Sequence, residues 1–286
     1  MRKNITFKGK SLTLSGRVLK IGSSAPNFRA VTQDLQEVTL LNFKDKIKLI
    51  SSFPSLDTPV CDLQVKEFNK KAANISSDIV ILGVSKDLPF AQKRFCSANE
   101  INREVVLSDY RYSSFGINYG LIIKELKLLG RSAFIVDKSD IVRYIQIVEE
   151  LTNPLDYAEV LKNLEEVAKS PMSTTTNKEK LPSKCIPCEG KVSPLPSDKI
   201  KTLISEYHGW ELVEDKKLVK EFKFSNFTDA KWFLDIVSAI AEEQGHHPTM
   251  TIIYNKLKVT LTTHAAGGLT ENDFIMAALI EEANTV

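Results

Sequence analysis

A stretch from Ala168 to Pro196 divides the chain into two parts that are expected to fold separately. It holds five of the eleven prolines and the polar run Pro-Met-Ser-Thr-Thr-Thr-Asn-Lys-Glu-Lys. Composition of this kind is typical of a linker, and 286 residues are enough for a core on each side of it. The sequence therefore predicts domains at residues 1–167 and 197–286, joined by a flexible linker over residues 168–196.

The net charge gives no reason to expect a nucleic acid or an anionic membrane as a partner. Lys and Arg number 38 against 36 for Asp and Glu, which leaves +2. The N-terminus is polar and no segment approaches about eighteen consecutive apolar residues, so we expect neither an export signal nor a membrane span. A cytoplasmic location is the default expectation.

The first domain alternates two hydrophobic periodicities. Apolar and β-branched runs predict strands at residues 46–53, 79–84, 132–136 and 141–148. Helical patterns follow Pro59, begin near Leu88 and span residues 153–167. Strands that alternate with helices predict an α/β fold for this domain.

Cys61 carries the first chemical signal. Thr58 followed by Pro59 is typical of a helix N-cap and first helical position, which places Cys61 in the first turn. The helix terminus stabilises a thiolate there, and the thiolate is the nucleophile. A cysteine protease also needs a histidine, and this domain contains none. A reactive thiol and a buried packing cysteine are the two interpretations left open.

The motif Thr58-Pro59-Val60-Cys61 and three further segments resemble the thiol peroxidases of the atypical two-cysteine peroxiredoxin class. The segments are Ser85–Cys96, Leu107-Ser108-Asp109 and Gly130–Asp137, and the resemblance covers residues 6–167. It implies a thioredoxin-like fold, with Cys61 as the peroxidatic and Cys96 as the resolving cysteine. It also implies that Thr58 and Pro54 bind the peroxide and that Arg131 stabilises the thiolate. Arg143 is the alternative should the register slip.

The implied reaction follows the oxidation ladder of cysteine. Peroxide oxidises Cys61 to a sulfenic acid, which condenses with Cys96 to a disulfide and is reset by a thioredoxin-like dithiol donor. Cys96 ends a helical pattern from Leu88 to Phe95, where a lone cysteine can also serve packing alone. Because both cysteines are expected on helices, the disulfide should need local unfolding of one of them.

Three of the four histidines, His246, His247 and His264, gather close together in the second domain. Imidazoles titrate near neutral pH, so the cluster favours proton transfer or metal binding over core packing. Zinc is the less favoured interpretation, because no cysteine lies near them and neighbours on an extended chain point to opposite faces.

The pattern around these histidines predicts their scaffold. Helical spacing predicts a helix over residues 227–245, and strands are expected at 249–254 and 257–263 on either side of an Asn255-Lys256 turn. His264 would then lie at a strand end, where the second strand returns it toward His246 and His247. Thr270 and Asp273 have the spacing of a helix capping box, which is the structural alternative to a role for Asp273 in the site.

From Trp210 to the C-terminus the chain resembles pterin-4a-carbinolamine dehydratase. The shared motifs are Glu242, His246-His247-Pro248, Tyr254-Asn255-Lys256, Thr263-His264, Gly268-Leu269-Thr270 and Asp273. The resemblance implies a smaller α+β domain, with helices on one face of an antiparallel sheet, that dehydrates a 4a-hydroxytetrahydropterin without a metal. His246, His247 and His264 would be its acid and base groups, and Trp210, Glu242, Pro248 and Asp273 would lie at the pterin site. The pterin is then a substrate, and no tightly bound cofactor is expected.

The linker contains Cys185-Ile186-Pro187-Cys188. A CxxC pair can relay thiols, here toward Cys96, or supply half of a metal site between molecules. Bacterial relatives of the dehydratase begin with a similar stretch of unknown use. All three interpretations stay open.

The two resemblances together predict a bifunctional enzyme. It would reduce hydrogen peroxide and organic hydroperoxides, dehydrate pterins and self-associate, with an aromatic amino acid hydroxylase as a further candidate partner. The alternative is a peroxide sensor, in which oxidation of Cys61 changes how the C-terminal module binds a partner protein.

Overall fold

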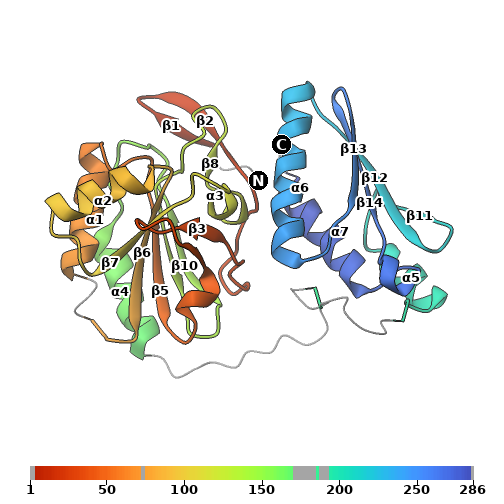
Figure 1. Ribbon diagram of the computed structural model, residues 1–286, viewed down its shortest axis with the longest axis horizontal. Helices are drawn as coiled ribbons and strands as arrows, with labels where there is room; N and C mark the ends of the chain where they lie inside the picture. Colours follow the sequence, from red (N-terminus) through yellow and green to blue (C-terminus); the bar gives the residue numbers. More distant parts are fainter. Residues whose placement is uncertain (1–3, 72–74, 170–184, 187–192, 285–286) are drawn as a thin grey trace. The chain divides into compact units, whose positions relative to one another are not determined.

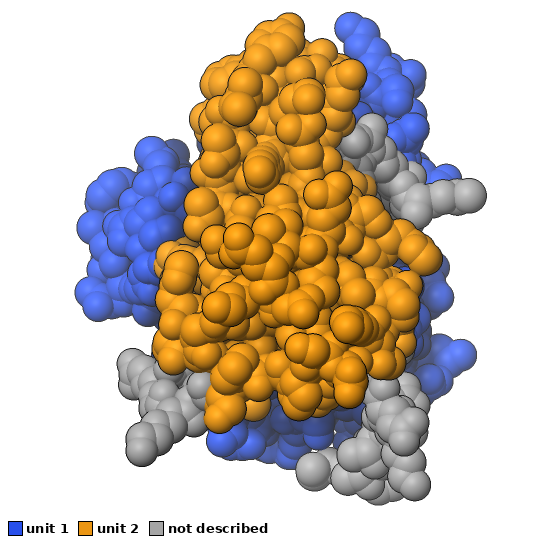
Figure 2. Space-filling model, turned by 90° about the vertical axis from the view of Figure 1, so that its right-hand side faces the viewer, with its two compact units in different colours: residues 1–175 blue, residues 176–286 orange. Residues whose placement is uncertain are grey.

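The computed structural model describes residues 4–71, 75–169, 185–186 and 193–284. The chain forms two compact units, residues 1–175 and 176–286, which Figure 2 draws in different colours. Most of the predicted linker over residues 168–196 lies outside the described residues, so its flexibility stays a prediction. Within the ranges given above, no helix is both long and apolar enough to cross a membrane.

A seven-stranded sheet forms the centre of the first unit, in the order β10-β9-β5-β6-β7-β3-β4. Its strands are β3 (Arg29–Val31), β4 (Glu37–Thr39), β5 (Ile47–Ser52), β6 (Ile79–Ser85), β7 (Glu104–Ser108), β9 (Ser132–Val136) and β10 (Val142–Ile147). Strands β5, β6 and β7 run parallel, and β9 lies antiparallel to β5. All four predicted strands are confirmed, because β5, β6, β9 and β10 occupy the expected positions.

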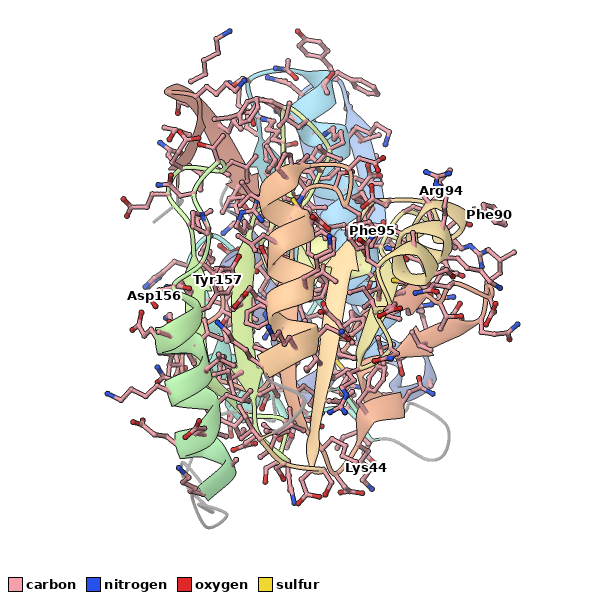
Figure 3. The ribbon with its side chains drawn as sticks, turned by 90° about the vertical axis from the view of Figure 1, so that its left-hand side faces the viewer. Lys44, Phe90, Arg94, Phe95, Asp156 and Tyr157 are labelled. Carbon is pink, nitrogen blue, oxygen red and sulfur yellow. The ribbon has the colours of Figure 1, made fainter. Side chains whose placement is uncertain are left out.

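Three helices cover one face of this sheet: α1 (Pro59–Lys71), α2 (Pro89–Ala98) and α4 (Tyr157–Lys169), as Figure 3 shows. Phe68 of α1 and Leu164 of α4 share a buried core with Leu49, Ile81 and Ile135 of the strands. The short helix α3 (Ser114–Asn118) belongs to a separate aromatic cluster, in which the Phe115 ring stacks on Tyr119 at 4.5 Å. The predicted α/β architecture is thereby confirmed.

Helix α4 differs from its predicted bounds at both ends. The pattern predicted a start at Asn153, but Pro154 disfavours helical backbone in the residue before it. Asp156 instead caps the helix, since its carboxylate accepts a hydrogen bond from the Glu159 amide at 2.9 Å. The helix continues to Lys169, past the predicted domain end at residue 167.

The first unit also contains a three-stranded sheet with the order β1-β2-β8. It consists of β1 (Asn4–Phe7), β2 (Lys10–Ser15) and β8 (Ile122–Ile123). Thr6 of β1 accepts a 2.8 Å hydrogen bond from the Leu151 amide, and the Thr6 amide donates to Glu149 at 2.6 Å. This pairing fixes the backbone at Leu151, which matters for the site described below.

The second unit is a four-stranded antiparallel sheet with the order β11-β12-β14-β13. The strands are β11 (Glu211–Val213), β12 (Lys217–Lys223), β13 (Thr249–Ile253) and β14 (Lys256–Leu261). Helices α6 (Phe227–Gln244) and α7 (Glu271–Ala283) lie on one side of this sheet in Figure 1, and α5 (Ser197–Ile204) precedes the first strand. The expected α+β architecture is therefore confirmed for this unit.

Local signals explain both ends of α6. The Asn226 side chain accepts a hydrogen bond from the Asp229 amide at 2.9 Å and so caps the first turn. Gly245 follows the last turn with φ of 62°, in the left-handed region that glycine adopts without steric cost. The predicted helix over residues 227–245 is confirmed.

The hairpin turn lies one residue earlier than predicted. Ile253 pairs with Lys256, so the two turn residues are Tyr254 and Asn255 rather than Asn255 and Lys256. Asn255 makes this register favourable, because its side chain donates to the Phe224 carbonyl at 2.7 Å and its carbonyl accepts from the Phe224 amide at 2.8 Å. Tyr254 takes the strained position of the turn, with φ of 49°.

Candidate active sites

Cys61 lies in the first turn of α1, as the Thr58-Pro59 signal predicted. Its amide donates to the Thr58 carbonyl at 3.1 Å, and its side chain is fully buried. The Thr58 hydroxyl lies 2.7 Å from the Cys61 sulfur and 3.2 Å from the Ser55 carbonyl. Because a hydroxyl has one proton, Thr58 can donate to the sulfur or to another acceptor, but to one at a time.

Arg131 is the arginine at Cys61. Its Nη2 atom lies 3.5 Å from the Cys61 sulfur and 3.2 Å from the Leu151 carbonyl, and its Nη1 atom donates to Gln64 at 2.7 Å. Arg143, the alternative, is instead paired with Asp137 at 2.6 Å. The pattern of residues 121–129 left this choice open, and of the two arginines the structure places Arg131 beside the Cys61 sulfur.

The guanidinium group of Arg131 is buried beside the Cys61 sulfur. The side chain is only 2% exposed, and the three atoms it contacts belong to an amide, a carbonyl and the thiol. A buried cation without a counter-ion costs several kcal/mol. A thiolate at Cys61 would supply that counter-ion, and the Thr58 hydroxyl, 2.7 Å from the sulfur, would donate a second hydrogen bond to it.

Two residues at this site were not found from the sequence. Gln64 lies one turn after Cys61 on the buried face of α1, and its amide group donates to Ser51 at 2.6 Å. Tyr157 opens α4 (Figure 3), and its buried hydroxyl has no hydrogen-bond partner among the described residues. Burial raises the pKa of Tyr157, while the nearby Arg131 cation opposes this rise. A polar residue three positions after a reactive cysteine was the available signal for Gln64.

Asp87 holds the loop that carries Pro54 and Thr58. It accepts hydrogen bonds from the Ser55 hydroxyl at 2.7 Å and from the Leu56 amide at 2.8 Å. Pro54 is buried directly after β5. The structure therefore places both predicted peroxide-binding residues on one loop, just before Cys61.

Cys96 lies inside α2 rather than at its end, because the helix continues to Ala98. Its sulfur accepts a 3.2 Å hydrogen bond from Gln33. Burial raises the pKa of the Cys96 thiol to about 11. Cys61 and Cys96 are both free thiols and belong to one apolar cluster with Phe53, Val65 and Val106. Phe95 packs against this cluster, whereas Phe90 and Arg94 of the same helix are exposed (Figure 3).

His246 and Asp273 form the buried part of the site in the second unit. The His246 Nε2 atom lies 2.8 Å from one carboxylate oxygen of Asp273. The other oxygen accepts hydrogen bonds at 2.8 Å from the Thr263 hydroxyl and from the Thr270 amide. Asp273 thus closes the predicted capping box of α7 and also contacts His246, while its role at the pterin site stays a prediction.

The other two histidines are exposed. The His247 ring lies 2.9 Å from Glu242, and both side chains are more than half exposed. His264 does not end a strand as predicted, since β14 stops at Leu261 and His264 begins a 3₁₀ turn. No described residue hydrogen-bonds to its ring. Pro248 is half-buried between His247 and β13.

Trp210 is held by the opposite end of α7. Its indole N–H donates to Glu281 at 2.8 Å, and its ring meets Phe222 edge-on at 6.2 Å. Glu281 and Asp273 are separated by eight residues of one helix, or about 12 Å. These contacts hold Trp210 within the fold. Its role at the pterin site stays a prediction.

Cys185 and Ile186 lie against the second unit. The Cys185 amide donates to Gln244 at 2.9 Å, and the Ile186 amide donates to Asn272 at 2.9 Å. These partners precede Gly245-His246 and Asp273 directly in the sequence. Cys188 lies outside the described residues, so its predicted pairing stays open. No group of three or more His, Cys, Asp or Glu side chains in the described ranges could hold a metal ion.

Comparison with known proteins assigns each unit to a family. Residues 20–162 match the Redoxin family model, and residues 193–283 match the model for pterin 4 alpha carbinolamine dehydratase. The thiol peroxidase of Oceanobacillus iheyensis is 47% identical over 161 residues, which cover 56% of this chain and 98% of that protein. The thiol peroxidase of Bacillus subtilis is 46% identical over 153 residues, covering 54% and 91%.

A solved structure supports the fold of the first unit. The peroxiredoxin-like protein from Aquifex aeolicus superposes with a TM-score of 0.55 at 40% identity, covering 58% of this chain and 97% of that one. The expected thioredoxin-like fold is therefore confirmed for the first unit.

Proposed function

The chain belongs to the redoxin family, as a thiol peroxidase joined to a pterin-4a-carbinolamine dehydratase domain, and we propose that Cys61 is its peroxidatic cysteine. Both families are enzymes, and the matches do not favour the alternative of a peroxide sensor. The contact of Arg131 and Thr58 with one sulfur is the observation that carries the proposal.

The peroxide step uses these two donors. The Cys61 thiolate attacks one oxygen of the peroxide, the O–O bond breaks, and the other oxygen leaves as hydroxide or alkoxide and takes up a proton. Negative charge moves from the sulfur to the leaving oxygen, so the Arg131 cation stabilises it throughout. Thr58, whose hydroxyl is 2.7 Å from the sulfur, can turn its proton toward the bound peroxide.

Cys96 completes the cycle as the resolving cysteine. Its thiol condenses with the Cys61 sulfenic acid, which forms the disulfide and releases water. Both sulfurs are buried in helices, and we propose that α1 or α2 opens locally for them to meet. We propose a thioredoxin-type dithiol as the reductant and the reducing cytoplasm as the location of the protein.

The dehydratase step needs a proton for the leaving hydroxyl of the pterin and a base for a proton on its ring nitrogen. We assign these transfers to the exposed rings of His247 and His264, which a substrate can reach. His246 is the buried member of the group, and its bond to Asp273 fixes the orientation of its ring. We propose that the pterin is a substrate and that neither site needs a tightly bound cofactor. A hydroxylase partner and self-association are further proposals.

Peptide mapping after oxidation tests the peroxidase assignment. Reduced full-length protein receives one equivalent of hydrogen peroxide and is analysed by mass spectrometry without reduction. We expect a Cys61–Cys96 disulfide in the native sequence and a dimedone-trapped sulfenic acid at Cys61 in Cys96→Ser. The matched variant Cys185→Ser should behave like the native protein. A disulfide between Cys96 and Cys185 as the main product would contradict the assignment.

A further inference from the structure

Glu104 is an acidic side chain buried without a partner. It is the first residue of β7, and it is 5% exposed. Neither of its carboxyl oxygens has a hydrogen-bond partner among the described residues. A buried polar group of this kind opposes folding of the region around it, and it calls for an explanation.

Glycine at position 83 makes room for this carboxyl group. A Cβ atom at Gly83, on the neighbouring strand β6, would lie 2.2 Å from Oε1 of Glu104 and 3.4 Å from the Phe53 ring. Phe53 and Val106, which follows Glu104 on the same face of β7, belong to the apolar cluster that contains Cys61 and Cys96. The acid therefore lies in the layer between the sheet and the two helices that carry the cysteines.

Among the described residues, no charged side chain that α1 or α2 buries faces Glu104 across this layer. The side chains that α1 buries are Cys61, Gln64, Val65 and Phe68, and those that α2 buries are Pro89, Gln92 and Cys96. The titratable groups among them are the two thiols. Burial alone raises the pKa of Glu104 well above its usual value, and its charge would in turn raise the pKa of Cys96.

We infer that Glu104 is a positioning residue that promotes the local opening needed to join Cys61 to Cys96. In the packed state, burial favours the protonated form of the carboxyl group. When α1 or α2 opens, water reaches the group, its proton leaves to solvent, and the open state gains the hydration of a carboxylate. On closing, the proton returns from solvent, so the sulfenic acid and thiol still condense to disulfide and water with no further reactant.

The sign of the pH dependence follows from this exchange. The packed state binds a proton that the open state releases, because the pKa of Glu104 is raised in the packed state. The contribution of Glu104 to the stability of the packed state is therefore fully present below about pH 4.5, the pKa of an exposed glutamate. This contribution is lost as pH rises toward the pKa of Glu104 in the packed state. Within this window, opening becomes up to about tenfold more favourable per pH unit, and above it the effect is constant.

Substitution of Glu104 in the full-length chain tests the inference. Glu104→Gln keeps the shape but cannot ionise, and Glu104→Leu fills the space with an apolar side chain. Glu100→Gln, an exposed residue just before β7, is the matched control. After one equivalent of hydrogen peroxide, disulfide formation is followed by acid quenching and alkylation from about pH 5 to about pH 9, and the sulfinic acid at Cys61 is measured in excess peroxide.

We expect the ratio of the native rate to the Glu104→Gln rate to rise with pH and then level off, whereas the ratio to Glu100→Gln stays constant. Glu104→Leu should form the disulfide about tenfold more slowly near neutral pH, accumulate more sulfinic acid, and protect α2 amides more strongly from hydrogen exchange. Should Glu104→Leu fail to fold, the pH profile of Glu104→Gln decides alone.

Parallel pH profiles for the native protein and Glu104→Gln would overturn the inference. The inference about Glu104 rests on the proposed function. The experiment must therefore distinguish failure of the peroxidase cycle from failure of the role given to Glu104. If the native protein forms no Cys61–Cys96 disulfide, the proposed cycle itself is wrong. If the disulfide forms at the same rate in every variant, the cycle stands and only the role of Glu104 is refuted.

Discussion

Gln64 holds the guanidinium group of Arg131 by a 2.7 Å hydrogen bond, while the same group reaches the Cys61 sulfur at 3.5 Å. Gln64 is itself tied to β5 through Ser51 at 2.6 Å. The position of the cation therefore depends on a chain of contacts from the sheet through α1, rather than on Cys61 itself. Rigid support of this kind is what fixes a charged group for catalysis.

Replacing Gln64 should impair the first chemical step. In Gln64→Leu the Nη1 atom of Arg131 loses its acceptor, and we expect the second-order rate of Cys61 oxidation to fall about tenfold, or about 1.4 kcal/mol. The rate is measured as sulfenic acid formed per unit time in a Cys96→Ser background. Gln92→Leu is the matched control. Gln92 is a buried glutamine of α2, and its side chain donates to the Leu107 carbonyl at 2.9 Å. Equal losses in both variants would mean that Gln64 acts only through stability.

Cys96 should resist alkylation in the folded protein. Its pKa is raised to about 11 by burial, so at about pH 8 roughly one molecule in a thousand carries the thiolate. Iodoacetamide followed by peptide mass spectrometry should modify Cys96 only after denaturation in urea. Labelling of Cys96 at the same rate with and without urea would show that α2 already opens freely in the reduced state.

The sequence predicted the parts of this molecule that depend on neighbours along the chain. The helix start at Pro59, the glycine stop at Gly245 and the capping box at Thr270 and Asp273 follow from local signals, and each was found in place. One error arose where a distant partner decides. The hairpin turn shifted by one residue because Asn255 bonds to Phe224, the residue that follows β12.

The site was predicted as residues, but its geometry was not. Cys61 and Arg131 are 70 positions apart, and Gln64 and Tyr157 reach the same place from two helices. Tertiary packing brings them together, and no periodicity encodes it. Glu104 is a further case, because the space for its buried carboxyl group depends on Gly83 of the neighbouring strand β6.

Asp109 should make the stability of the first unit depend on pH. Its carboxylate accepts hydrogen bonds from the Phe115 amide at 3.0 Å and the Gly116 amide at 3.1 Å, yet burial raises its pKa to about 6, against the opposing effect of Lys86. The folded state then holds the proton more tightly than the unfolded one. The contribution of Asp109 to the free energy of unfolding is fully present below about pH 4 and is lost as pH rises through about 6. The loss amounts to up to about 3 kcal/mol.

The difference in unfolding free energy between the native protein and Asp109→Asn isolates this contribution. Urea titrations at several pH values should show the native protein losing stability relative to the variant between about pH 4 and about pH 6. Asp78→Asn is the comparison, because Asp78 is an exposed residue whose pKa is lowered by its bond to Lys138. A difference for Asp109→Asn that does not change with pH would refute the assignment.

Asp273 combines a structural and a chemical contact, and two substitutions should separate them. Asp273→Asn leaves an oxygen for the Thr270 amide but removes the charge opposite His246, so we expect dehydratase activity to fall about a hundredfold, with little change in melting temperature. Thr270→Ala removes the cap hydroxyl and keeps the His246–Asp273 bond, so it should cost about 1 kcal/mol of stability and leave activity within about twofold.

Dehydration of a 4a-hydroxytetrahydropterin is followed by absorbance in both variants, beside thermal unfolding of the same samples. Asp273 contributes chemistry beyond helix capping only if Asp273→Asn loses activity but keeps its stability, while Thr270→Ala loses stability but keeps its activity. Loss of activity that tracks loss of stability in both variants would reduce Asp273 to a capping residue and leave the exposed rings of His247 and His264 as the reactive groups.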